Sequence, residues 1–291
     1  MRAISTNANL VGSLWMVAAM FGFALEDSFF KASTDTLPIG QAIVLLGATG
    51  ALIFSILARR NEQSLLVAEV RSKPMIIRAG FEITGRLFFF LAIALAPLSS
   101  ATVILQATPI VVVAGAALFL GDKVGWRRWL AIALGLTGVL IVLNPDSQSF
   151  TWHSAFAVIG MLGFAGRDLA SRAAPATLTT SVLGFYGFLA IIVAGIIYRY
   201  WSGEPFVTVT FENGTLIALS AVFGVLGYSS LMKAMRTGEI SAVAPFRYSR
   251  LLIGLGIGVL WFGESLTTRM LIGSAIIILA GLFLLWRGRS S

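Results

Sequence analysis

Two arginines and a tyrosine stand at the start of a segment that is otherwise apolar enough to lie in lipid. Arg247, Tyr248 and Arg250 introduce an apolar run that continues to Phe262. An arginine near the middle of a membrane helix costs about 2.5 to 3.5 kcal/mol on insertion scales, so it normally faces a cavity or a partner. A guanidinium group can donate two parallel hydrogen bonds to a carboxylate or phosphate. The segment therefore predicts a site that binds an anionic group.

A third arginine within an apolar run has an acidic neighbour on its own helix. Glu82 and Arg86 are four residues apart, so they share one face of a helix and can pair. Pairing is how membrane helices tolerate charge, so a purely structural role is one interpretation. The alternative is a cavity in which Arg86 also binds substrate and Glu82 balances charge or carries a proton.

Acids elsewhere in the apolar runs are candidates to compensate the arginines of the first segment. No acid is adjacent in sequence to Arg247 or Arg250, and the obvious partners are Glu26, Asp27 and Asp168. A carboxylate in a membrane helix can balance a guanidinium or carry a proton. Structural compensation and anion binding both stay open for the two arginines.

Three further charged residues have simpler interpretations. Arg167 is expected near the end of its helix, where a long side chain extends to the membrane surface. Asp122 and Glu264 each precede the last helix of one half of the chain. A carboxylate is favourable at a helix N-terminus, so a structural role is expected for both.

The composition identifies the solvent around these residues. Hydrophobic residues make up 57% of the 291-residue chain and charged residues 12%, with a mean hydropathy of +0.90. Soluble domains carry about twice that share of charge, so this is an integral membrane protein in a lipid bilayer. The net charge of +8 does not indicate nucleic acid, because the lysines and arginines cluster in short loops between apolar runs.

Neither a metal centre nor a catalytic centre is indicated. The chain has no cysteine and one histidine, which excludes disulfides, iron–sulfur clusters and Cys/His zinc sites. Gly-x-Ser-x-Gly, His-Glu-x-x-His and Walker A motifs are also absent from the sequence. We therefore expect no enzyme, no catalytic residues, no metal and no cofactor.

Apolar runs of the length that a bilayer requires recur along the whole chain. They predict about ten membrane helices: Leu10–Phe30, Ile39–Ala58, Pro74–Leu95, Leu98–Phe119, Trp126–Leu143, Ser154–Arg172, Leu178–Tyr198, Gly214–Met235, Ile240–Phe262 and Met270–Trp286. Lysines and arginines on alternate loops place both termini in the cytoplasm. The residues assigned to the cytoplasmic side include Arg59, Arg60, Arg71, Lys73 and Arg78.

The two halves of the chain repeat one pattern. Gly22-Phe23-Ala24 and Asp27 recur 141 residues later as Gly163-Phe164-Ala165 and Asp168. Gly85-Arg86 likewise corresponds to Gly227-Tyr228, which places Tyr228 opposite Arg86. Five crossings per half make the second half enter from the opposite side, so residues 1–146 and 147–291 are expected to form an inverted repeat.

These features resemble the EamA repeat of the drug/metabolite transporter superfamily over nearly the whole chain. The resemblance rests on the two five-helix units, Asp27, Pro245-Phe246-Arg247-Tyr248 and Phe262-Gly263-Glu264. It implies an all-α, ten-helix carrier of the bacterial inner membrane with a central cavity between the repeats. Members are often exporters of amino acids or other metabolites, and the fold does not imply one substrate.

The expected function is secondary transport of a small metabolite by alternating access. An amino acid, organic acid or nucleotide-like substrate would meet Arg86, Tyr228, Arg247, Tyr248 and Arg250, with proton coupling and exchange both open. The alternatives are a cationic drug or metabolite exporter of the same fold and, third, a channel. The protein is expected as a monomer or homodimer.

Overall fold

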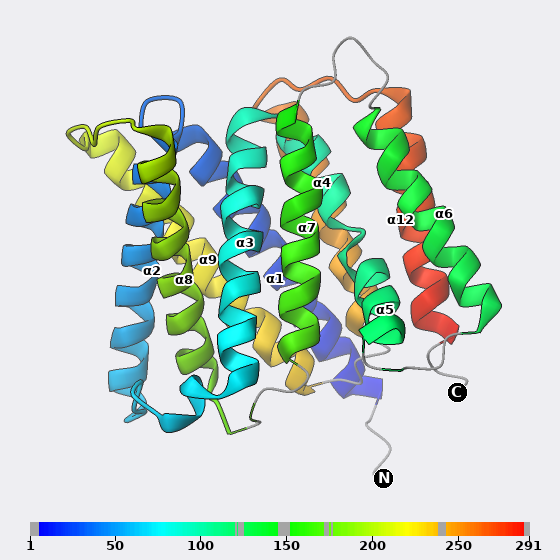
Figure 1. Cartoon of the computed structure of the whole chain (residues 1–291), viewed down its shortest axis with the longest axis horizontal. Coiled ribbons are helices and arrows are strands. Elements are labelled where there is room, and N and C mark those ends of the chain that lie inside the picture. The colour runs from blue at the N-terminus through cyan, green and yellow to red at the C-terminus, as the bar shows by residue number, and fades with distance from the viewer. Residues whose placement is uncertain are drawn as a thin grey trace.

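The computed structural model describes residues 6–119, 121, 125–144, 152–171, 175, 177–237 and 243–287. These residues form helices joined by short connections, and no strand occurs among them (Figure 1). In chain order the elements are α1 (Thr6–Ser33), α2 (Ile39–Arg60), the 3-10 helix η1 (Ala68–Arg71), α3 (Lys73–Leu95), α4 (Leu98–Leu105), α5 (Thr108–Phe119), α6 (Trp126–Leu143), α7 (Trp152–Ser171), α8 (Thr180–Ser202), α9 (Phe211–Thr237), the 3-10 helix η2 (Ala244–Tyr248), α11 (Ser249–Leu260) and α12 (Thr268–Arg287).

Several helices are suited to crossing a bilayer. Within the described ranges, six candidates are long and apolar enough by length and composition, counting Leu98–Phe119 as one. Large apolar side chains such as Leu52, Leu252 and Leu279 point outward and are more than half exposed. An outer surface of this kind belongs in lipid, because soluble monomers rarely expose large contiguous apolar patches. The expected all-α integral membrane fold is confirmed.

The helix packing follows the expected inverted repeat. Helix α1 packs along α9, and its counterpart α7 packs along α3, the counterpart of α9. The remaining partners are the equivalent helices of the two halves, α2 with α8 and α6 with α12. The latter pair lies side by side at one end of the molecule, with α2 and α8 at the other (Figure 1). Helix α1 begins and α12 ends at the same face, called here the terminal face.

Glycines bring the equivalent helix pairs into close contact. A Cβ atom built on Gly22 would lie 2.9 Å from the Cα of Gly227, and one built on Gly163 would lie 2.5 Å from the Cα of Gly85. These are the residues that the sequence pairs as repeat equivalents. Because membrane helices associate mainly by close packing, small residues at the two crossings let α1 approach α9 and α7 approach α3.

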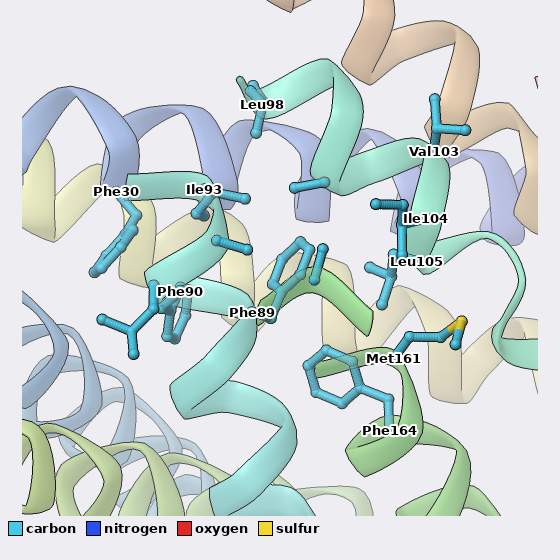
Figure 2. Packing of buried hydrophobic residues seen from close by; sticks show 14 of the residues in the cluster. Phe30, Phe89, Phe90, Ile93, Leu98, Val103, Ile104, Leu105, Met161 and Phe164 are labelled. Carbon is cyan, nitrogen blue, oxygen red and sulfur yellow. The ribbon is translucent and has the colours of Figure 1, made fainter. Parts of the chain in front are cut away.

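Aromatic and branched side chains fill the space between α1, α3, α4 and α7 (Figure 2). Phe30 and Phe90 are fully buried, with ring centroids 4.3 Å apart. Phe89 on α3 and Phe164 on α7 point toward one another, with centroids 5.8 Å apart. This packing positions the charged faces of α1, α3 and α7 toward one another.

The fourth membrane helix of each half departs from a continuous α-helix, which the sequence did not predict. Helix α4 ends at Leu105 and α5 begins at Thr108. Pro109 has no N–H to donate to the Leu105 carbonyl, and the Thr108 hydroxyl donates to that oxygen instead, at 2.6 Å. In the second half, η2 gives way to α11 at Ser249, 142 residues after Ala107. The expected spans Leu98–Phe119 and Ile240–Phe262 are therefore not continuous α-helices, and residues 240–242 lie outside the described ranges.

Glu264 caps a different helix from the one expected. Its carboxylate accepts hydrogen bonds from the backbone N–H groups of Leu98, at 2.6 Å, and Ser99, at 2.9 Å. These are the first residues of α4, whose N-cap, Pro97, makes no side-chain cap. The structural role is confirmed, but the helix is α4 rather than α12. Asp122 lies outside the described residues.

Candidate functional site

Glu82 is the centre of a buried charge cluster on α3. Arg78, Glu82 and Arg86 are spaced four residues apart, so their side chains share one face of the helix. Glu82 is 3% exposed, and its two oxygens lie 3.3 Å from Arg78 Nη2, Arg86 Nε and Arg167 Nη1. The expected pair between Glu82 and Arg86 is present. One carboxylate compensates three guanidinium groups, which makes Glu82 a structural hub.

Two arginines of this cluster lie where the sequence interpretation did not place them. Arg78 was counted with the basic residues of the cytoplasmic side, at the start of the expected span Pro74–Leu95, but it is buried and donates to the Ser171 hydroxyl at 3.0 Å. Arg167 was expected to extend to the membrane surface, but it pairs with Glu82 and with Asp168, at 2.8 Å. Glu82 lies on the same helix as Arg78 and faces Arg167 from the neighbouring helix, and ion pairs with it hold both side chains inside the bundle.

Glu26 extends the cluster to α1. Its Oε1 lies 3.3 Å from Arg86 Nη1, and the residue is 1% exposed. A Cβ atom at Gly224 would lie 2.7 Å from the same oxygen, so the glycine on α9 leaves room for the carboxylate. The other oxygen, Oε2, is buried and has no hydrogen-bond partner among the described residues. Arg86 therefore joins Glu26 to Glu82, and Glu26 retains a free acceptor.

Arg250 joins the two halves of the protein through Asp27. The distance from Arg250 Nη2 to Asp27 Oδ2 is 2.5 Å. The guanidinium carbon also lies over the rings of Phe23, at 5.3 Å, and Phe89, at 5.5 Å. Arg250 Nε is buried without a hydrogen-bond partner in the part of the chain that the structure describes. Of the proposed partners for Arg250, the structure selects Asp27.

Arg247 is held more loosely than Arg250. Its nearest carboxylate oxygen, Oδ2 of Asp168, lies 3.9 Å from Nη2, at the limit for an ion pair. The side chains of Arg247 and Asp168 are 32% and 26% exposed, whereas those of Glu26 and Asp27 are 1% and 2% exposed. The two arginines also lie on different elements, η2 and α11, rather than on one helix. Arg247 is thus the most accessible guanidinium of the cluster.

The cluster carries an excess of positive charge. Its members are five arginines and four acids: Arg78, Arg86, Arg167, Arg247 and Arg250 with Glu26, Asp27, Glu82 and Asp168. With all groups ionised, the difference between five and four leaves one positive charge. A buried excess charge is costly unless a counter-ion or ligand compensates it.

The two tyrosines of the expected site pack against other helices. Tyr248 is 6% exposed, and its hydroxyl occupies the space left by the missing side chain of Gly281 on α12. The Tyr228 ring meets Phe54 edge-on, with centroids 5.9 Å apart. Both tyrosines lie between helices, and the ion pairs of the cluster are formed by arginines and acids.

Gln106 is a site residue that the sequence interpretation missed. It lies at the break between α4 and α5, is 7% exposed, and donates from Nε2 to the Arg247 carbonyl at 3.1 Å. The repeat offset of 142 residues pairs it with Tyr248 at the break of the second half. The sequence did contain a signal for this residue, because Gln106 is a polar residue within an apolar run and corresponds to Tyr248 in the repeat. The contact brings the two helix breaks together beside Arg247.

No group of His, Cys, Asp or Glu side chains that could hold a metal ion occurs among the described residues. The site therefore consists of guanidinium, carboxylate and amide groups. These groups bind by hydrogen bonds and charge.

Comparisons with known proteins identify the family of the chain. The model of the EamA-like transporter family matches residues 10–144 and again residues 151–287. A pseudopaline exporter, CntI, of Pseudomonas aeruginosa strain UCBPP-PA14 is 29% identical over 92% of this chain and 94% of its own. A riboflavin transporter of Rhizobium johnstonii is 25% identical over 97% of this chain and 93% of its own. An S-adenosylmethionine uptake transporter of Rickettsia bellii is 28% identical over 69% of this chain and 70% of its own.

A solved crystal structure shows the same fold. It superimposes with a TM-score of 0.64 and 18% identity, covering 98% of this chain and 99% of its own. The family model covers both halves of the chain, and the relatives are named as transporters of metabolites rather than as enzymes. The protein is a multi-pass membrane protein of the EamA-like transporter family.

Proposed function

We propose that this protein is a secondary transporter that moves a small metabolite bearing a carboxylate or phosphate across the bacterial inner membrane. The observation that carries the proposal is the excess of arginines over acids at the boundary between the two repeats. An anionic ligand supplies the missing negative charge, and guanidinium groups bind carboxylates and phosphates through paired hydrogen bonds.

Arg247 is the proposed first contact of the substrate. Its guanidinium is partly exposed and lies 3.9 Å from Asp168, so an incoming anion competes with a weak protein partner. Arg250 and Arg86 lie deeper and are already paired with Asp27, Glu26 and Glu82. Of these deeper arginines, Arg250 has a buried Nε donor that a substrate oxygen could satisfy. Tyr228 and Tyr248 border this site through packing.

Alternating access follows from the ion pairs that cross the repeat boundary. Arg250 with Asp27 and Arg167 with Glu82 each join one repeat to the other. Inverted-repeat transporters work by movement of one repeat against the other around a site near the midplane. A substrate anion that takes over one of these guanidinium groups weakens the contact between repeats and leaves a carboxylate able to bind a proton. This exchange of partners is the proposed route by which Glu26, Asp27 or Asp168 couples transport to protons.

The cationic alternative is disfavoured by the same arrangement. An organic cation would need a carboxylate with no arginine beside it, and each of the four acids in the cluster lies within 4 Å of a guanidinium group. The pairs are complete within one chain, so a monomer contains the whole site. A homodimer would carry two independent sites.

A thermal-shift experiment tests the proposed substrate class. Purified protein would be heated with matched ligands, each metabolite as its free carboxylate and as its uncharged amide. A ligand that binds only the folded state at about 100 times its Kd stabilises it by about 2.7 kcal/mol. The proposal predicts stabilisation by carboxylates or phosphates and none by the matched amides. Stabilisation by organic cations alone would assign the site to the alternative.

A further inference from the structure

The connection between α3 and α4 is held from both sides by charged residues of other elements. It lies at the face opposite the terminal face, where α3 ends at Leu95 and α4 begins at Leu98. Lys31 of α1 donates from Nζ to the carbonyls of Ile93, at 2.8 Å, and Ala96, at 2.9 Å. Glu264, from the connection between α11 and α12, accepts from the first two N–H groups of α4. Lys31 and Glu264 are called here the corner clasp.

The charges of the corner clasp match the helix ends that they contact. The last carbonyl groups of α3 are the negative end of its dipole, and the ammonium of Lys31 binds there. The first N–H groups of α4 are the positive end of its dipole, and the carboxylate of Glu264 binds there. The clasp thus uses backbone groups that would otherwise lack partners, and Glu264 does so from the second repeat.

The surrounding residues are shaped for the same contact. A Cβ atom on Gly258 would lie 2.8 Å from Glu264 Oε2, so the glycine makes room for the carboxylate. The Glu264 N–H also donates to the Gly258 carbonyl, at 2.9 Å. Lys31 Nζ lies 5.5 Å from the ring centroid of Phe262, two residues before Glu264. Ser99, whose N–H donates to Glu264, is only 1% exposed.

Accessibility of the charged site differs between its two ends. Asp168 and Arg247 are about one-quarter to one-third exposed, whereas Asp27, four residues before Lys31 on α1, is 2% exposed. The clasp therefore seals the end of the bundle at which the site is least accessible. This seal joins α1 and the α3–α4 connection of the first repeat to the α11–α12 connection of the second.

We infer that Lys31 and Glu264 form the closure that shuts the face opposite the termini, and that opening this face during transport requires Glu264 to release α4. The inference rests on the proposed alternating access. It assigns Glu264 a conformational role in addition to helix capping, because the same carboxylate both caps α4 and joins the two repeats.

Cysteine labelling tests the closure without a substrate. The chain has no cysteine, so Ser99→Cys introduces a single thiol at a buried position in contact with the clasp. The variant would be placed in lipid nanodiscs, where both faces are accessible, and treated with a membrane-impermeant maleimide. Glu264→Gln and Lys31→Gln would each be added to this background. Glu212→Gln, an exposed acid in the first turn of α9, is the matched control.

Both clasp variants are expected to raise the labelling rate of Cys at position 99 by about tenfold or more, the effect of losing one charged hydrogen bond. Glu212→Gln should leave the rate unchanged. A direct effect of charge on the thiol cannot mimic this result. Loss of a nearby carboxylate favours the thiolate and loss of a nearby ammonium disfavours it, so only opening raises the rate in both variants.

Unchanged labelling in Glu264→Gln or in Lys31→Gln would overturn the closure. If Glu264→Gln does not fold, Lys31→Gln alone decides the test. Loss of the lysine charge disfavours the thiolate and would by itself slow labelling, so faster labelling in this variant can come only from opening. Failure of the proposed substrate class would leave these rates unaffected, because no ligand is present. The two proposals therefore fail separately.

Discussion

Arg250 on α11 donates to Asp27 on α1 with 2.5 Å between Nη2 and Oδ2, which joins the two repeats inside the membrane. The guanidinium is covered by Phe23 and Phe89, and Asp27 is 2% exposed, so water screens the pair weakly. Breaking a buried pair by removing one partner typically costs about 3 to 5 kcal/mol, because an uncompensated charge is left behind.

Asp27→Asn should therefore lower the free energy of unfolding by about 3 to 5 kcal/mol. The double variant Asp27→Asn with Arg250→Gln should be less destabilised than the sum of the two single variants, because it leaves no unpaired charge. Denaturant unfolding of the four proteins in detergent measures this difference. Glu212→Gln serves as the control, with a change within about 0.5 kcal/mol. Strict additivity would show that the pair contributes nothing to the fold.

Glu82→Gln should be at least as damaging as Asp27→Asn. It removes the carboxylate that faces Arg78, Arg86 and Arg167, all of which lie 3.3 Å away. We expect a loss of about 3 to 5 kcal/mol, since three guanidinium groups then lack their shared partner. Yield of folded protein and midpoint of thermal unfolding are the readouts. Normal stability of Glu82→Gln would mean that Glu82 is not the hub of the cluster.

The same substitution, glycine to alanine, should have opposite effects on stability at a helix crossing and at an open position. Gly163→Ala places a methyl group 2.5 Å from the Cα of Gly85, and overpacking of this kind costs about 1 to 3 kcal/mol. Gly187→Ala on α8 meets no atom within 4 Å, so the alanine should stabilise the helix by about 0.4 to 1 kcal/mol. Thermal unfolding of the two variants checks the contrast. Equal effects would mean that the α3–α7 crossing is not close.

Topology is a separate prediction from the bias of lysine and arginine. Reporter domains fused after Ser291 and within the loop from Arg59 to Lys73 should both report the cytoplasm. A reporter at Asp146 should report the periplasm. The expectation follows from an even number of crossings with positive loops inside. A periplasmic C-terminus would contradict the proposed orientation.

The sequence predicted the architecture because the repeat is visible in residues that the structure uses. Gly22 and Gly163 occupy equivalent positions of the two repeats, 141 residues apart, and each lies at a close contact between two helices. The repeat in the sequence is therefore also a repeat in the packing. Length and apolar composition were sufficient to place most membrane helices. The pairing of Glu82 with Arg86 followed from helix spacing alone.

The remaining features depend on contacts between segments distant in sequence. Arg167 meets Glu82 from another helix, and no local pattern distinguishes such an arginine from one that extends to the membrane surface. Glu264 caps a helix that begins 166 residues earlier. The break at Gln106 lies within a run long and apolar enough to cross a bilayer, and Gln106 and Pro109 were its local signs. Partner choice among buried charges is a tertiary property, so the sequence left it open.

Binding to Arg247→Lys is the most direct test of an anion site at the repeat boundary. Isothermal titration would compare the parent, Arg247→Lys and the control Arg59→Lys, an exposed arginine in the last turn of α2, against a carboxylate ligand and its amide. Lysine keeps the charge but loses the paired hydrogen bonds. We predict normal folding, binding of the carboxylate weakened by about 1.5 to 3 kcal/mol in Arg247→Lys only, and no binding of the amide. Equal affinity of all three proteins for the carboxylate, or a confirmed substrate that is an organic cation, would contradict this prediction.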